Sequence, residues 1–173
     1  MRPELQAATL AMLRDGNRLF MPHSVTVGDG NHHSSYRHHS PRHLRLASQA
    51  EIKGLDFQSL TLIERALQYD QTHTLNDVLA DLREGRAQLW LATDNDEVEG
   101  IAVTCITEYP QTTTCLIWLC AGISREKYTP LIGNIEQWAK AHGCASISLE
   151  GRAGWERILT DFDKTKIILE KRL

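Results

Sequence analysis

Alternating apolar and polar positions divide most of the chain into short strands and helices. Residues 43–47 alternate as in a half-buried strand, and Ser48 and Glu51 then have the spacing of a helix capping box. Apolar residues recur at helical spacing over residues 55–67 and again over residues 75–84. The pattern therefore predicts a strand followed by a helical region with two main helices at the start of a folded domain.

Three strand patterns follow in quick succession, over residues 88–93, 98–107 and 113–121. The polar run 94–97 predicts a tight turn between the first two, and Pro110 interrupts the pattern between the second and third. Short connections of this kind join antiparallel neighbours. The third strand is apolar at successive positions, so we expect both of its faces to be covered and the strand to lie at the centre of the sheet.

The remaining residues predict a helix, a strand, a short helix and a last strand. Thr129–Pro130 opens a helix that ends near Gly143, and residues 145–149 return to the strand pattern. Residues 155–162 predict the short helix and residues 165–169 the final strand. The whole order predicts an α/β fold of the α+β kind, in which helices flank a mixed, mostly antiparallel central sheet.

Residues 1–43 differ from the rest and predict an extended N-terminal arm ahead of one domain, residues 44–173. Residues 3–15 predict a short helix, whereas residues 21–43 lack periodicity and are rich in Gly, Ser and Pro. Their few apolar side chains cannot offset the conformational entropy of ordering the loop, so we expect another protein chain to order it. The residues expected to contact that partner are Leu5, Met12, Leu13, Leu19, Phe20, Tyr36, Arg37 and Arg42.

Charge is distributed unevenly along the chain, whose net charge is −3. Residues 1–50 hold six Lys or Arg against three Asp or Glu, and residues 51–173 hold thirteen against nineteen. The acidic balance of the domain argues against binding to nucleic acid. No stretch has the roughly 20 apolar residues of a membrane span, and the charged start is unlike a secretory signal peptide. We expect neither a membrane span nor secretion by that route.

Histidine and cysteine are the residues most able to bind a metal ion in this sequence. Six of the eight histidines lie between His23 and His43, where Asp29 is the only accompanying acidic residue, so we expect no specific metal site. Protonation of this tract would instead raise the positive charge of the arm. The four cysteines lie in apolar segments without a CxxC pair, which predicts buried thiols: Cys105, Cys115, Cys120 and Cys144.

The order of elements after residue 43 resembles the layout of the GNAT acyltransferase superfamily. Several phrases of the sequence carry this resemblance. The segment Glu150–Arg157 also resembles a short sequence motif found in GNAT-like proteins encoded by bacteriophages. The phrases similar to the first three strands and the central helix of the superfamily are Leu44–Ala47, Gln88–Ala92, Val98–Ala102 and Ile135–Cys144.

The resemblance implies a place for acetyl-CoA, which members of the superfamily bind on a glycine-rich loop and the central helix N-terminus. The corresponding stretch here, residues 121–130, has a single Gly, and Pro130 lacks an amide donor. The tyrosine acid that many members carry on the last helix is replaced by Trp155 and Phe162. We therefore expect no cofactor, no catalytic residues and no acetyl-CoA binding tighter than about millimolar.

Two functions remain open at this point. The first is a non-catalytic structural or accessory protein of a bacteriophage particle, found in the virion or the host cytoplasm, whose arm binds other virion proteins or copies of itself. The alternative is a divergent acetyl-CoA-dependent N-acyltransferase that modifies a host protein or a small amine. The missing glycines favour the first. The alternative places the cofactor on Gly122, Ser124, Arg125, Lys127 and Tyr128.

Overall fold

The computed structural model describes residues 42–70, 72–122, 132–151, 153–166 and 171. Most of the predicted arm and most of the predicted cofactor loop lie outside these residues. The elements follow the predicted order as far as the description reaches. They are β1 (His43–Leu46), α2 (Gln49–Lys53), α3 (Phe57–Leu67), α4 (Leu75–Arg83), β2 (Ala87–Asp94), β3 (Glu97–Tyr109), β4 (Thr112–Gly122), α6 (Ile132–Ala141), β5 (Ser146–Leu149) and the 3-10 helix η2 (Ala153–Arg157).

The strands form one sheet in the order β1-β2-β3-β4-β5. The first four are antiparallel neighbours, and β5 pairs parallel to β4. This confirms the predicted mixed, mostly antiparallel sheet. Among the strands that the structure describes, β4 is an interior strand with β3 and β5 as neighbours, and the middle position belongs to β3, one strand away from the prediction. An apolar run indicates that both faces of a strand are covered, but it does not determine the position of the strand in the order of the sheet.

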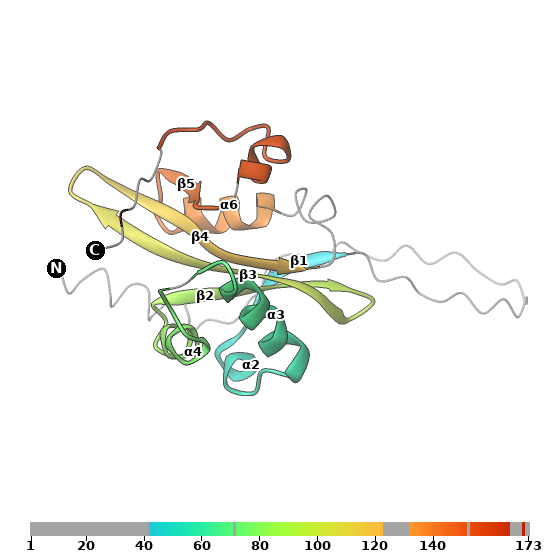
Figure 1. Cartoon of the computed structure of the whole chain (residues 1–173). Coiled ribbons are helices and arrows are strands. Elements are labelled where there is room, and N and C mark those ends of the chain that lie inside the picture. The colour runs from blue at the N-terminus through green and yellow to red at the C-terminus, as the bar shows by residue number, and fades with distance from the viewer. Residues whose placement is uncertain (1–41, 71, 123–131, 152, 167–170, 172–173) are drawn as a thin grey trace, which may run out of the picture. The chain divides into compact units, whose positions relative to one another are not determined.

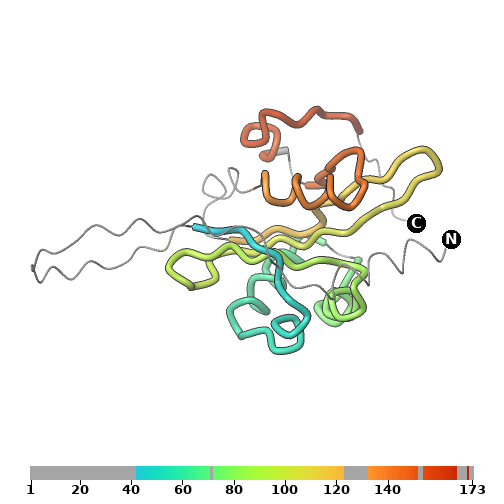
Figure 2. The backbone as a smooth tube through the Cα atoms, turned by 180° about the vertical axis from the view of Figure 1, so that it is seen from behind, coloured from blue at the N-terminus to red at the C-terminus, as the bar shows by residue number. Residues whose placement is uncertain are grey.

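Helices cover both faces of the sheet. Figure 1 shows α2, α3 and α4 on one face and α6 on the opposite face, and Figure 2, from behind, shows η2 on the same side as α6. Each face has its own apolar core: Ile63, Val78 and Leu82 are fully buried on the first, and Ile135 is fully buried on the second. The helices predicted around Leu60, Leu79 and Ile135 therefore flank the sheet as expected.

Local sequence signals explain where the elements begin and turn. Ser48 and Thr74 are the N-caps of α2 and α4, each with a complete capping box. Asn95 and Asp96 have φ values of 51° and 66°, as a two-residue hairpin turn between β2 and β3 requires. Among the described residues, no helix combines the length and the apolar character needed to cross a bilayer.

The C-terminal segment departs from the prediction of a helix over residues 155–162. The structure has a five-residue 3-10 helix, η2, followed by turns in which backbone hydrogen bonds join residues three or four apart. Leu159 is the buried residue of this stretch, and Trp155, Ile158 and Phe162 are half-buried. Their spacing is helical, so apolar periodicity alone does not decide between an α-helix and a short 3-10 helix with turns. The predicted last strand, residues 165–169, lies mostly outside the described residues, and Thr165 and Lys166 are not in a strand.

Candidate active site

Strand β4 contains a bulge at Trp118. Val103 of β3 is opposite Leu119, and the next residue, Thr104, is opposite Ile117, so Trp118 is the extra residue on β4. The neighbouring strand β5 pairs with β4 only over Thr114 to Ile117. The two strands therefore separate at the bulge. Beyond it, residues 119–122 have a strand partner on one side only within the part of the chain that the structure describes.

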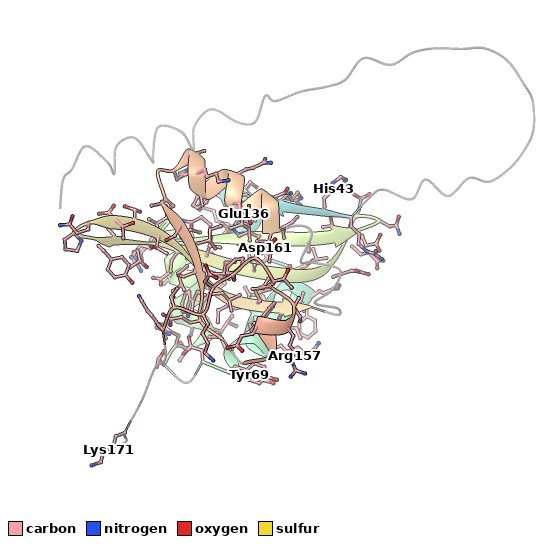
Figure 3. The ribbon with its side chains drawn as sticks, turned by 90° about the horizontal axis from the view of Figure 1, so that it is seen from above. His43, Tyr69, Glu136, Arg157, Asp161 and Lys171 are labelled. Atoms are coloured by element: carbon pink, nitrogen blue, oxygen red, sulfur yellow. The ribbon has the colours of Figure 1, made fainter. Side chains whose placement is uncertain are left out.

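A cavity of about 1590 Å³ lies at this separation. Its walls include β4 residues from Leu116 to Gly122, the first turn of α6 at Ile132, and Trp155 of η2. The end of α3 and the loop after it form another wall, on which Tyr69 is labelled in Figure 3. The separation of the two strands thus exposes strand backbone, a helix end and a polar loop to one space.

A hydrogen-bonded cluster centred on Asp70 lies on the loop between α3 and α4. Asp70 Oδ1 accepts hydrogen bonds from the Thr72 backbone N–H at 2.8 Å and from Thr72 Oγ1 at 2.5 Å. Asp70 Oδ2 accepts from Trp118 Nε1 at 3.0 Å and lies 3.0 Å from His73 Nδ1. Burial raises the pKa of Asp70, but these hydrogen bonds outweigh it and lower the pKa to about 2. Asp70 is therefore a carboxylate at neutral pH.

The charged side chains that line the cavity are mostly acidic. Among the described residues that line it, the acidic ones are Asp70, Asp81 and Glu150. Arg65 is the arginine among them and is positively charged. Asp81 forms an ion pair with Arg86 at 2.5 Å, which offsets its charge. Asp70 and Glu150 still give the cavity a negative balance, which suits a cationic ligand.

The cysteines of the domain do not supply a thiolate. All four are free, Cys115 is buried and the other three are half-buried, which corrects the prediction that all would be buried. Burial raises the pKa of Cys120, which lines the cavity, to about 12. Burial also raises the pKa of Cys105, with a further contribution from Asp81 and Glu150. These thiols stay protonated near neutral pH and are poor nucleophiles.

Few of the residues singled out from the sequence fall within the described chain. Gly122 ends β4 and lines the cavity, whereas Ser124, Arg125, Lys127 and Tyr128 lie outside the described residues. Within the described part, no three His, Cys, Asp or Glu side chains come close enough together to hold a metal ion. The predicted partner-contacting residues outside the description are Leu5, Met12, Leu13, Leu19, Phe20, Tyr36 and Arg37.

Arg42 is the one predicted partner-contacting residue that the structure describes. Its guanidinium forms an ion pair with Asp94 of β2 at 2.7 Å and lies 4.0 Å from Glu99 of β3. The contacts of the arm with another chain stay a prediction. Trp155 lines the cavity wall where the sequence predicted the last helix.

Sequence reasoning missed the cluster of Asp70, His73 and Trp118. One signal was available, since His73 lies in a short polar connection between two helical patterns. Nothing in the spacing showed that Trp118, 48 residues from Asp70, would bond to the same carboxylate. The bulge that holds Trp118 there is likewise a feature of the β3–β4 register.

Comparisons with known proteins give a consistent account of the fold. No protein-family model matches the sequence, and no curated protein sequence matches it either. Solved structures do match. A GNAT family acetyltransferase of Staphylococcus aureus is 18% identical, with 76% of this chain and 98% of that chain covered and a TM-score of 0.56.

Two further similar structures contain a form of coenzyme A. An aminoglycoside N-acetyltransferase in complex with CoA is 16% identical, with 81% of this chain and 99% of that chain covered and a TM-score of 0.57. A predicted acetyltransferase with acetyl-CoA from Clostridium acetobutylicum is 16% identical, with 76% and 96% covered and a TM-score of 0.58.

These matches contradict the prediction that the domain has no cofactor, because two of the similar structures hold CoA or acetyl-CoA. That prediction relied on the glycine pattern of residues 121–130, yet a pyrophosphate binds backbone amides, which any residue except proline supplies. None of these similar structures links the chain to a bacteriophage particle. The described part of the chain has the fold of the GNAT acetyltransferases.

Proposed function

We propose that this protein is an N-acyltransferase that moves an acetyl group from acetyl-CoA to a primary amine. The observation that carries the proposal is the separation of β4 from β5 at Trp118, which opens one side of residues 118–122 into a cavity of about 1590 Å³. The similar structures that contain CoA or acetyl-CoA support acetyl-CoA as the cofactor. The earlier alternative of an N-acyltransferase thus replaces the phage-particle role as the main hypothesis.

The residues around the cavity fit the chemistry of acetyl-CoA. Backbone N–H and C=O groups of residues 118–122 can pair with the amides of the extended pantetheine arm, as they would with another strand. The first described turn of α6, at Ile132, borders the cavity, and helix N-terminal amides favour phosphate. When bound, acetyl-CoA supplies an acetyl thioester, an activated acyl donor.

The acceptor is an amine in this proposal because of the charges around the cavity. Among the described residues, Asp70 and Glu150 line it together with one guanidinium, that of Arg65. Carboxylates attract ammonium groups and repel acids, so a cationic amine enters more favourably than an anionic substrate. The modified group can belong to a small amine or to a lysine side chain.

Calorimetric titration with acetyl-CoA, together with the release of free CoA thiol in the presence of primary amines, tests the proposal. We expect micromolar affinity and amine-dependent thiol release. Failure to bind acetyl-CoA at millimolar concentration would overturn the proposed function.

Gly133 offers a matched pair of variants for this test. It lies in the first turn of α6, and a Cβ there meets nothing within 4 Å, so side chains fit. Gly133→Asp places a negative charge beside the proposed pyrophosphate site and should weaken acetyl-CoA binding about tenfold. Gly133→Asn has nearly the same shape without the charge and should bind with near wild-type affinity. Equal affinities of the two variants would count against this placement of the pyrophosphate.

A further inference from the structure

The loop between α3 and α4 holds an imidazole against a half-buried carboxylate. The side chain of Asp70 is 15% exposed, whereas that of His73 is 41% exposed, and both line the cavity. Two hydrogen bonds from Thr72 fix one carboxylate oxygen of Asp70, and the other oxygen faces His73. The loop therefore presents the ring of His73 to the cavity and keeps its anionic partner behind it.

The hydrogen bonds decide which nitrogen of His73 carries the hydrogen. Nδ1 lies 3.0 Å from Asp70 Oδ2 and 2.7 Å from Thr72 Oγ1. The hydroxyl hydrogen of Thr72 is already donated to Asp70 Oδ1, so both oxygens near Nδ1 can only accept. Nδ1 must then be the donor, and the lone pair of the neutral ring is on Nε2. A ring nitrogen with a free lone pair can take up a proton.

Trp118 fixes this pair to the strand that borders the proposed acyl donor site. Its indole N–H donates to the same Asp70 oxygen that faces His73, and its ring packs edge-on against the imidazole at a centroid distance of 4.6 Å. Because Trp118 is the bulge residue of β4, the imidazole is held beside the point where β4 leaves β5.

We infer that His73 is the general base that takes a proton from the acceptor amine, and that Asp70 is the residue that positions it. The inference rests on the proposed function. A primary amine is mostly an ammonium ion at neutral pH and cannot attack a carbonyl carbon until it loses a proton. Histidine is the side chain most often used for this task. Asp70 orients the ring and stabilises the imidazolium that forms, as a buried carboxylate does for other catalytic histidines.

The proton balance needs no further reactant. The acceptor nitrogen loses two protons between the ammonium ion and the amide. His73 Nε2 takes the first from the ammonium ion and passes it to solvent, and it takes the second as the nitrogen forms its bond to the acyl carbon. The C–S bond breaks, and the sulfur leaves with the electron pair and accepts one proton, equal in number to the second that His73 took up. Two charged groups face the imidazole, Asp70 and Asp77, and Asp77 lies in the first turn of α4. Arg65 of α3 lines the same cavity.

His73→Asn is the decisive variant, because its amide can donate to Asp70 in place of Nδ1–H but offers no basic nitrogen. With acetyl-CoA as donor and spermidine, tyramine or a lysine-containing peptide as acceptor, we expect kcat to fall about a hundredfold to ten-thousandfold. The affinity for acetyl-CoA and the midpoint of thermal unfolding should stay near wild type. His142→Asn is the control, since His142 stacks on Trp138 but does not line the cavity. Its transfer rate should be unchanged.

Asp70→Asn tests the positioning role. We expect a smaller loss of kcat than in His73→Asn, and a neutral ring of His73 that no longer carries its hydrogen on Nδ1 alone, because Nδ1 loses its carboxylate acceptor. A purely structural role for Asp70 would lower the stability of the protein without changing the position of that hydrogen in the NMR spectrum, and this result would remove Asp70 from the inference.

A readout that needs no turnover completes the test. Long-range proton–nitrogen NMR of ¹⁵N-histidine-labelled protein should find the neutral ring of His73 with its hydrogen on Nδ1, and a hydrogen on Nε2 would overturn the inference. Unchanged transfer by His73→Asn would also overturn it, as would binding of acetyl-CoA without transfer to any of the three acceptors. A protein that does not bind acetyl-CoA contradicts the proposed function itself, so the two failures are distinguishable.

Discussion

Trp118 donates its indole N–H to Asp70 across 3.0 Å and thereby joins the bulge of β4 to the loop between α3 and α4. The donor comes from the sheet and the acceptor from a loop that follows the helix packed on that sheet. The contact fixes one wall of the cavity relative to another. A substitution at either end should therefore alter both the stability of the domain and the shape of the proposed acceptor site.

Trp118→Phe keeps an aromatic ring at the bulge and removes the donor to Asp70. The carboxylate then loses one of its hydrogen bonds, and we expect the free energy of unfolding to fall by about 1 to 2 kcal/mol. Urea denaturation followed by circular dichroism measures this change. Stability equal to wild type would mean that water replaces the indole at no cost.

Asp70 should make the stability of the protein depend on acidic pH. Its pKa is lowered to about 2 in the folded state, below the ordinary value of 3.8. Its carboxylate therefore stabilises the fold fully above the unfolded pKa, and this contribution is lost as the pH falls from about 4 through 2. The contribution should be about 1 to 2 kcal/mol after screening by solvent. Comparing urea midpoints at pH 6 and pH 2.5 should reveal a smaller pH effect in Asp70→Asn than in the wild type.

Gly151 and Gly133 should respond in opposite directions to substitution by alanine. A Cβ at Gly151 would lie 2.8 Å from Cδ1 of Trp155 and 3.0 Å from Cδ2 of Leu149, so the indole on the cavity wall must move. We expect Gly151→Ala to destabilise the domain by about 1 to 3 kcal/mol. At Gly133, where space is open, alanine should stabilise the helix by about 0.5 to 1 kcal/mol. Thermal unfolding of both variants checks the pair, and a stable Gly151→Ala would contradict the contact with Trp155.

The predicted N-terminal arm can be tested by deletion. Arg42 is paired with Asp94 and His43 is part of β1, so the deletion should stop at residue 41. We expect the shortened protein to fold with a thermal midpoint near that of the full chain, because the two described cores are built from Leu44 and later residues. A truncated protein without a cooperative unfolding transition would show that the arm belongs to the fold.

The sequence predicted the features that depend on local pattern. The capping box at Ser48 and the turn at Asn95 and Asp96 depend on neighbouring residues, and the structure has them where expected. The alternation of strands and helices was enough to reach the fold class. Sequence pattern was less informative where a short 3-10 helix, η2, replaced the predicted helix over residues 155–162.

The candidate site was not predictable in the same way. It depends on a register shift between β3 and β4 and on the contact of Trp118 with a loop 48 residues away, and neither has a local signature. The cofactor prediction failed for a related reason. It judged the site by glycines in residues 121–130, whereas separated strands and helix-end amides bind through backbone that most residue types can supply.

The central claim is that acetyl-CoA binds where β4 and β5 separate, and backbone amide NMR during a titration with acetyl-CoA tests it most directly. The account predicts saturable shifts at micromolar ligand for the amides of residues 118–122 and the first turn of α6 at Ile132. Amides of β1, which pairs with β2 at the far edge of the sheet, should move little. The absence of shifts at millimolar acetyl-CoA, or shifts confined to residues away from β4 and α6, would contradict it.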